Sequence, residues 1–358
     1  MNSTLPSRLP VAIIRGGTSR AVFCRLRDLP EDPHMRDELC LRLIGSPDPV
    51  AIDGLGGGVS SNSKVMFVGT AAEARERGLR IPAELPAEHL ISFFAQVSPA
   101  EPRVDWRGQC GNISAAISAY ALAEGLCSFP DTATEATLPV YNANTGMPLE
   151  LHHPLDGGRF PTSGDFVLDG VPGSAARVDL RFLLDDVPFR TTEIEGLMTT
   201  LIDVANPVAI VRAADIGVDV RLSPAELNAD SALLERLEAL RQAAGRDMGV
   251  ENSAVIPRVA IVEPLEDGAG LRARMTSVGI IHHALPGTGL LALGAARTLG
   301  APVIDLPPAE ETRIEHPKGE ATVSAHLEGE RLRWVALARS ARIILRGEVE
   351  LRGDAPRD

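Results

Sequence analysis

Two glycine-containing turns, each followed by an apolar run of helical length, constrain the fold of this chain most strongly. The turns, at residues 108–111 and 286–289, precede apolar runs at residues 113–126 and 290–300. Because both runs are apolar on nearly every face, each predicts a helix buried inside a domain. The turns start 178 positions apart in a chain of 358 residues. This spacing indicates two similar halves, each built round one buried helix.

Runs rich in β-branched and aromatic residues surround both turns and predict mostly antiparallel sheets. The expected strands include residues 11–15, 21–26, 65–68, 91–97, 199–204, 208–211, 258–262 and 271–278. Apolar residues at helical spacing predict helices at residues 33–44 and 223–245. The expected fold class is therefore α/β (α+β), with two pseudo-repeated domains. Each is a mostly antiparallel sheet or barrel wrapped round a central helix.

The boundary between the two domains is expected near a polar, proline-containing stretch at residues 184–195. Strand patterns continue to residue 351, and in a duplicated fold the final strand can return to the first domain. We therefore expect one domain formed by residues 1–188 with 340–358, and a second formed by residues 189–339.

Charge and cysteine usage exclude several classes of protein. A net charge of −13 argues against nucleic-acid binding, which needs a basic surface, but a local field can still attract a small anion. Four scattered cysteines without a C-x-x-C pair favour reduced thiols. The first residues lack the apolar core of a signal peptide, and no apolar run reaches 18 residues. We therefore expect a soluble, cytoplasmic protein that does not bind membranes.

Cys110 lies inside the first turn, directly before the predicted buried helix. A helix start presents free backbone N–H groups and the positive end of the dipole, which favours an anion and lowers the pKa of a thiol. A substrate carboxylate on the turn beside Cys110 is one interpretation. The other is a core helix that happens to begin after a cysteine.

Lys64 joins a glycine- and serine-rich loop, residues 52–63, to an apolar strand. Partial desolvation at such a junction lowers the pKa of an amine towards that of a useful base. The alternative is a lysine whose stem lies along a strand end and whose amine reaches solvent. The loop is not a nucleotide site, because Ser63 precedes the lysine and a strand follows it.

A third candidate segment is the turn at residues 16–20, which combines two glycines and two hydroxyl residues with Arg15 and Arg20. This composition is compatible with a contact to an anion as well as with a plain hairpin. Histidine pairs at 152–153 and 282–283 do not predict a metal site, because adjacent side chains project apart and no third ligand recurs at metal spacing.

Six motifs, in the same order along the chain, resemble the PrpF family. They are residues 15–19, 52–58 followed by Ser63 and Lys64, 105–106 with 110–112, 164–170, 316–319 and 339–342. The resemblance extends from about residue 9 to residue 351. It implies a diaminopimelate-epimerase-like fold of two α/β domains with the active site between them.

The resemblance also implies an activity. PrpF-type proteins move a double bond in a di- or tricarboxylic acid by shifting a proton, without a metal or organic cofactor. Lys64 and Cys110 match the family's catalytic lysine and cysteine. The expected substrate contacts are Arg15, Gly17, Thr18, Ser19, Arg20, Ser63, Gly111, Asn112, Gly287, Thr288 and Gly289. The expected partner is a small carboxylate, and a homodimer is the candidate assembly.

Two departures from the family pattern accompany the resemblance. Arg20 stands where the family's first motif usually continues with lysine, and extra sequence at residues 75–88 lengthens the interval between Lys64 and Cys110. Thr288 occupies the place where we expect an amino-acid racemase of this fold to carry its second catalytic cysteine. Two-thiol racemisation is therefore not expected.

The chain's length resembles that of the 4-oxalomesaconate tautomerases more than that of the typically longer 2-methylaconitate isomerases. The expected activity is therefore that of a 4-oxalomesaconate tautomerase, in the catabolism of gallate and protocatechuate. Its alternatives within the family are 2-methylaconitate cis-trans isomerase, of the methylcitrate pathway, and methylitaconate isomerase. A non-catalytic protein that binds carboxylates is the alternative of a different class.

Overall fold

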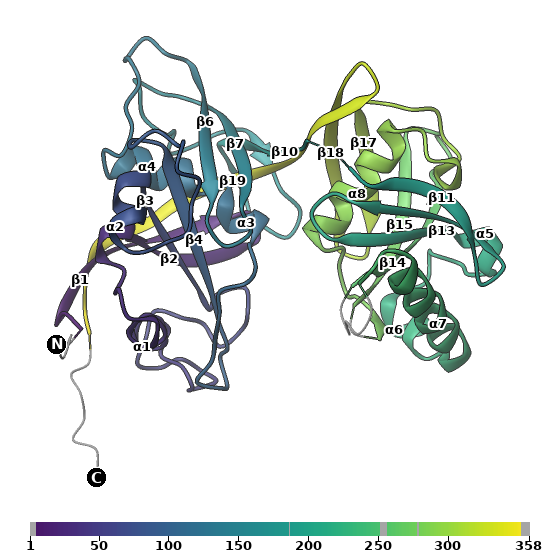
Figure 1. Cartoon of the computed structure of the whole chain (residues 1–358), viewed down its shortest axis with the longest axis horizontal. Coiled ribbons are helices and arrows are strands. Elements are labelled where there is room, and N and C mark those ends of the chain that lie inside the picture. Colours follow the sequence, from purple (N-terminus) through teal and green to yellow (C-terminus); the bar gives the residue numbers. More distant parts are fainter. Residues whose placement is uncertain (1–4, 186, 251–255, 278, 352–358) are drawn as a thin grey trace. The chain divides into compact units, whose positions relative to one another are not determined.

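The computed structural model describes residues 5–185, 187–250, 256–277 and 279–351 (Figure 1). The chain divides into two compact units, Met1–Leu180 with Arg339–Asp358, and Arg181–Ala338. The second unit thus begins at Arg181 and not at residue 189. The reason is that the chain passes between the units inside two continuous strands, β10 (Arg177–Leu183) and β19 (Arg331–Glu350), and not in a polar loop.

The first unit contains strands from both ends of the chain. Its strands, besides parts of β10 and β19, are β1 (Arg8–Gly16), β2 (Ser19–Arg25), β3 (Lys64–Thr70), β4 (Leu90–Val97), β5 (Val104–Asp105), β6 (Glu135–Asn142), β7 (Met147–Pro154), β8 (Phe166–Val167) and β9 (Ser174–Ala175). Its helices are η1 (Leu26–Asp28), α1 (Pro33–Ile44), α2 (Ala71–Glu76), α3 (Gly111–Ser114) and α4 (Ile117–Ala123).

The second unit repeats this kind of composition. Its strands, besides parts of β10 and β19, are β11 (Phe189–Ile194), β12 (Leu197–Asp203), β13 (Pro207–Arg212), β14 (Arg258–Pro264), β15 (Gly270–Ser277), β16 (Ile280–Ile281), β17 (Glu311–His316) and β18 (Gly319–Glu328). Its helices are α5 (Ala213–Ile216), α6 (Pro224–Asn228), α7 (Ser231–Asp247), α8 (Gly287–Thr298) and η2 (Pro302–Ile304).

The two units share one order of strand pairing, which supports the internal repeat. In the first, β1–β2, β3–β4 and β6–β7 pair antiparallel, whereas β2–β3 and β4–β6 pair parallel. In the second, β12–β13, β14–β15 and β17–β18 pair antiparallel, whereas β13–β14 and β15–β17 pair parallel. Each parallel step needs a crossover. The second crossover of each unit carries the glycine turn and the buried helix.

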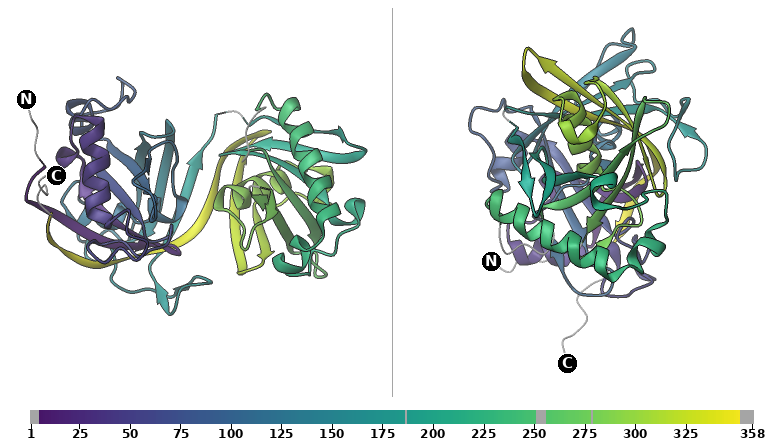
Figure 2. Two further views of the ribbon diagram at one scale, coloured as in Figure 1. Left: turned by 90° about the horizontal axis from the view of Figure 1, so that it is seen from below. Right: turned by 90° about the vertical axis from the view of Figure 1, so that its right-hand side faces the viewer.

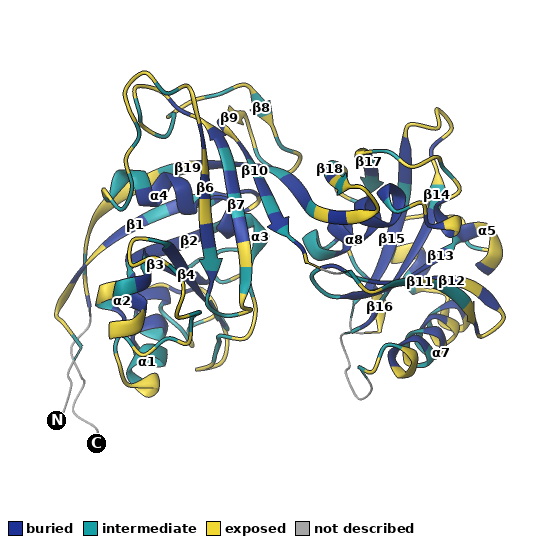
Figure 3. Cartoon of the chain, turned by 45° about the horizontal axis from the view of Figure 1, so that its top comes forward, coloured by how far each residue is buried: buried dark blue, intermediate teal, exposed yellow. Residues whose placement is uncertain are grey.

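Helix α8 is the centre of the second unit. Residues 289–298 are all buried, and the helix contacts β12 and β13 as well as β17 and β18. Since these strands come from both ends of the pairing order, the sheet curves round the helix. Helix α7 lies on the outside of that sheet and buries only one stripe, Leu233, Leu237, Leu240, Ala244 and Gly245, while its other face is exposed (Figures 2 and 3).

The apolar run at residues 113–126 is buried only over residues 113–121, and it is not one helix. It forms α3 and α4, separated at Ala115 and Ala116. The Ala116 N–H donates to Ile113 O at 3.0 Å, three residues back, so the α-helical pattern is interrupted by a tighter turn. Tyr120 in α4 packs against Phe23 of β2, with ring centroids 5.4 Å apart.

Gly294 in α8 provides a test of this packing. In an exposed helix, alanine in place of glycine stabilises, but a Cβ here would lie 2.3 Å from Val323 Cγ1. Gly294→Ala should therefore lower the free energy of unfolding by about 1–3 kcal/mol, the usual cost of overpacking. Urea titration measures this change.

Val323→Ala, which removes both methyl groups of that contact, should cost less in the Gly294→Ala background than alone. Simple additivity of the two losses in free energy would contradict the overlap between α8 and β18.

Candidate active site

Lys64 is the first residue of β3 and is only 7% exposed. Its ammonium group donates to Gln96 Oε1 and lies 5.5 Å from the centroid of the Phe94 ring. Burial lowers the pKa of Lys64, and the nearby Cys110 opposes this effect. The amine is therefore desolvated, and the side chain of Gln96 is its acceptor.

Cys110 is the N-cap residue of α3 and is half-buried. The segment before it is anchored by Trp106, which stacks on Phe93 at 4.8 Å and donates to Asp37 Oδ1 at 2.7 Å. Helix α3 spans four residues only, so the dipole of a long helix, assumed from the sequence, is not available here. The first-turn N–H groups remain, since they have no partner inside a helix.

Arg339 begins the last of the six motifs, but the sequence assigned it no role in the site. It lies in β19, it is 8% exposed, and its Nε donates to Asn112 Oδ1 at 3.0 Å. Burial lowers the pKa of Arg339 to about 10, and a negative charge on the nearby Cys110 would raise it. The same thiol therefore lies close enough to both Lys64 and Arg339 to interact with their charges.

The β1–β2 turn approaches α3 closely. Asn112 Nδ2 donates to the exposed Thr18 Oγ1 at 3.0 Å. A Cβ on Gly16 would lie 2.2 Å from Asn112 O, and one on Gly17 would lie 2.2 Å from Asn112 Oδ1. Gly17 also has a φ of +50°. Both glycines are thus required by the approach of the turn to the start of the helix.

Other predicted contacts in the first unit serve the loops around the site. Arg15 donates at 3.0 Å to Gly17 O and to both Ser340 oxygens, and its pKa is lowered by burial and by Arg342. Arg20 donates to Gly56 O at 3.2 Å and so holds the glycine loop. Ser19 and Ser63 are buried, and Gly111 is the first residue of α3.

The extra sequence at residues 75–88 is organised by Arg75. Its Nη2 donates to three main-chain oxygens, at 3.3 Å to Pro82, 3.1 Å to Ala83 and 2.7 Å to Leu85. The segment therefore forms a loop closed by one exposed arginine, after α2.

In the second unit, Gly287, Thr288 and Gly289 form the first turn of α8, and Pro286 is its N-cap. Because Cys110 is the N-cap of α3, it corresponds to Pro286, and Thr288 corresponds to Asn112. The match of Cys110 with Thr288 made from the sequence is therefore wrong by two residues. Pro286 carries no ionisable group, so the conclusion that a second thiol is missing is unchanged.

Lys64 also has a counterpart in the second unit. Arg258 begins β14 as Lys64 begins β3, in each case after the first parallel crossover. Arg258 is half-buried, and its Nε has no hydrogen-bond partner within the described part of the chain. Burial lowers the pKa of Arg258. The repeat thus places a fixed cation where the first unit has a lysine.

One of the two histidine pairs, 282–283, differs from expectation. The rings of His282 and His283 do not project apart but stack, with centroids 4.3 Å apart. Within residues 5–185, 187–250, 256–277 and 279–351, no group of three or more His, Cys, Asp or Glu side chains is arranged to hold a metal ion. Over the same residues, no helix is both long and apolar enough to cross a membrane.

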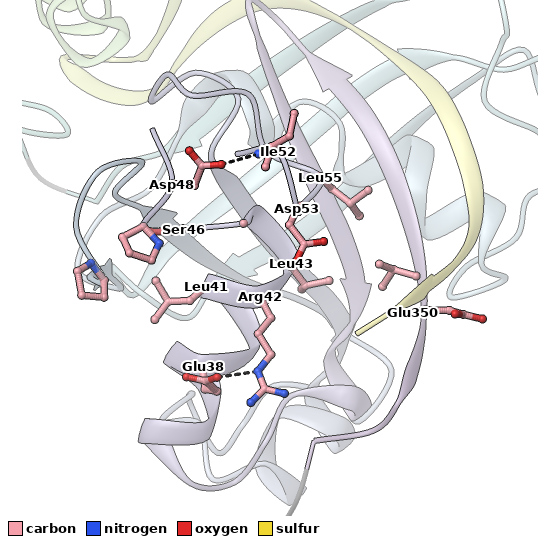
Figure 4. Close-up of a pocket in the computed structure, with 15 residues that line it drawn as sticks. Glu38, Leu41, Arg42, Leu43, Ser46, Asp48, Ile52, Asp53, Leu55 and Glu350 are labelled. Carbon is pink, nitrogen blue, oxygen red and sulfur yellow. Dashed lines mark hydrogen bonds and ion pairs between the residues drawn. The ribbon is translucent and has the colours of Figure 1, made fainter. Parts of the chain in front are cut away.

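A cavity of about 610 Å³ also occurs in the first unit, away from Lys64 and Cys110 (Figure 4). It lies between α1 and the loop that follows it, and Figure 4 shows Arg42 paired with Glu38 and Asp48 bonded to Ile52. None of the predicted site residues lines it.

Comparison with known proteins confirms the family resemblance. The family model described as PrpF protein matches residues 6–352. The chain is 32% identical over 405 residues to the 2-methyl-aconitate isomerase of Shewanella oneidensis, covering 98% of this chain and 99% of that protein. It is 33% identical over 370 residues to the 4-oxalomesaconate tautomerase of Pseudomonas putida, covering 96% of each.

Among solved structures, that of methylitaconate-delta-isomerase covers 99% of this chain and 100% of its own, with a TM-score of 0.82 and 29% identity. The predicted fold class, diaminopimelate-epimerase-like with two α/β halves, is confirmed by such structural matches. The family match covers nearly the whole chain, and the named relatives are isomerases or tautomerases. This chain is therefore an isomerase that belongs to the PrpF family.

Proposed function

We propose that this isomerase catalyses a 1,3-allylic proton shift in a di- or tricarboxylic acid, with 4-oxalomesaconate as its substrate. The observation that carries the proposal is the buried amine of Lys64 close to the Cys110 thiol, with its pKa lowered by burial. A base must be neutral before it can accept a proton, and a desolvated lysine meets this condition nearer to neutral pH.

Lys64 removes the proton from the allylic carbon. The electron pair of that C–H bond forms the new C=C, and the original C=C shifts its electrons towards the adjacent carbonyl or carboxylate. The resulting dienolate is protonated at the far end of the allyl system. Overall one proton moves, no electron is gained or lost, and no cofactor is required by this balance.

The negative charge of the dienolate needs stabilisation where it develops. Cys110 is the candidate for a hydrogen bond or a proton to this charge, and the buried Arg339 cation favours negative charge at the same place. The backbone N–H groups at the starts of α3 and α8 suit carboxylates. Thr18, Ser19, Asn112 and Thr288 are the side chains proposed to contact the substrate.

The choice of substrate rests on the alignments. The alignment with the 4-oxalomesaconate tautomerase spans 370 positions, and the alignment with the 2-methyl-aconitate isomerase spans 405. Since this chain has 358 residues, the shorter alignment requires fewer insertions. 2-Methylaconitate and methylitaconate are the alternative substrates within the family.

The function is tested by ¹H NMR in deuterated water, with 4-oxalomesaconate, 2-methylaconitate and methylitaconate supplied separately. Isomerisation of 4-oxalomesaconate with the highest kcat/KM is the expected result. A higher kcat/KM for either other acid would overturn the substrate assignment. Absence of both isomerisation and deuterium exchange with all three would overturn the proposed reaction class.

Replacing Lys64 tests the base. Lys64→Met should lower kcat by about 10²–10⁴-fold, the usual contribution of a general base, and abolish deuterium incorporation. In the wild type, kcat/KM should rise with pH through the pKa of Lys64, below the ordinary lysine value of about 10.4. Lys318→Met, at an exposed position, is the control with unchanged rates. Full exchange in Lys64→Met would refute the assignment.

Replacing Cys110 tests the second group. Cys110→Ser should reduce kcat at least about 100-fold if the thiol stabilises or protonates the dienolate. Cys127→Ser is the matched control, because Cys127 is also half-buried and free. Wild-type turnover by Cys110→Ser would show that the thiol is structural.

A further inference from the structure

Gln96 lies near the end of β4, directly opposite Lys64 of β3 on one side and Asp105 of β5 on the other. It is half-buried and belongs to none of the sequence motifs. Its side chain contacts the amine of Lys64 through Oε1. The arrangement of the rest of the amide shows why this contact is directional.

The Gln96 amide is locked by main-chain acceptors. Its Nε2 donates to Ser63 O at 2.9 Å, with Ser60 O at 3.2 Å and Val97 O at 3.3 Å as further acceptors. Rotation of the amide by 180° would place Oε1 against these oxygens and Nε2 against the Lys64 amine, so acceptor would face acceptor and donor would face donor. Only one orientation satisfies both ends.

We propose that Gln96 is the positioning residue for Lys64, holding the amine by one N–H so that its remaining hydrogens or lone pair serve the reaction. This inference rests on the proposed role of Lys64 as the base. The glutamine carries out no chemistry itself. Three main-chain carbonyl groups fix the orientation of the Gln96 amide, and the amide in turn fixes the direction of the Lys64 amine.

The neutrality of Gln96 is part of the argument. A carboxylate at the same distance would favour the ammonium form of Lys64 and oppose the effect of burial. The ionisable side chain that acts on Lys64 in the described structure is Cys110 at the start of α3, and the same thiol acts on Arg339 of β19. The acid next to Gln96 in register, Asp105, is paired with Arg107 at 2.8 Å. Because Gln96 is neutral, it orients the amine without raising the pKa of Lys64.

The chain contains only two lysines, Lys64 and Lys318, which permits a direct experiment. In protein labelled with ¹³Cε-lysine, NMR should give two lysine side-chain signals, and the exposed Lys318 is an internal control. Gln96→Glu should raise the pKa of Lys64 by about 1–3 units, the usual effect of an adjacent opposite charge, and move the acid limb of kcat/KM to higher pH. Lys318 should not shift.

Gln96→Leu removes the acceptor. It should lower kcat by about 10–100-fold, as expected for a misplaced reacting group, with little change in KM, and it should lower the ¹³Cε order parameter of Lys64. Asn144→Leu is the matched control, because Asn144 Nδ2 bridges main-chain oxygens of Phe94 and Trp106 at 2.8 and 2.6 Å. That variant should lower the melting temperature but leave the Lys64 titration unchanged.

An unchanged Lys64 titration in Gln96→Glu, or wild-type kcat and order parameter in Gln96→Leu, would overturn the positioning role. If Asn144→Leu changed the titration and the order parameter of Lys64 as much as the Gln96 variants do, the role would also be overturned. The effect would then reflect a general loss of stability. If the wild type isomerises no acid, the proposed function fails on its own. The titration and order parameter of Lys64 still decide whether Gln96 holds the amine.

Discussion

The hydrogen bond from Arg339 to Asn112 is the interaction on which the first unit depends. Asn112 also donates to Thr18, so two bonds join the returning strand β19, the start of α3 and the β1–β2 turn. A buried charge is costly unless it is hydrogen-bonded. The bond to the guanidinium therefore requires β19 to meet the start of α3, and the second bond of Asn112 ties the β1–β2 turn to the same point. Because the same cation lies near Cys110, closing the unit also sets the electrostatic field of the site.

The choice of cations along the chain is itself informative. The chain contains 33 arginines and two lysines. Arginine keeps its proton near neutral pH, whereas a desolvated lysine can lose its proton there. Lys64 lies where burial lowers its pKa and where Gln96 supplies a neutral acceptor. Arginines elsewhere hold loops by bonds to main-chain oxygens, as Arg75 does, or form ion pairs, as Arg272 does. Of the two lysines, Lys318 is exposed and Lys64 lies where a removable proton has chemical value.

The sequence predicted the elements whose signal is local. The two apolar runs, the glycine turns and the loop-to-strand junction at Lys64 each carry their information within a few residues. Arg339 lies in a motif, but its burial and its bond to Asn112 could not be predicted, because they form only when β19 returns to the start of α3. Gln96 depends on the register of β3 and β4. The interruption at Ala115 and Ala116 is a change in backbone hydrogen bonding inside an apolar run, which the periodicity of the sequence does not reveal.

The repeat is symmetrical in its strand order but not in its chemistry. Lys64 and Cys110 of the first unit correspond to Arg258 and Pro286 of the second, so one half has groups that can exchange protons and the other has a fixed cation and backbone N–H groups. Racemisation by two thiols requires an acid and a base on opposite faces of one carbon. An allylic shift instead moves a proton between two carbons, and one base can serve both on the same face. Under the proposed mechanism, the loss of reactive groups from one half is therefore what distinguishes transfer along a substrate from inversion at a single carbon.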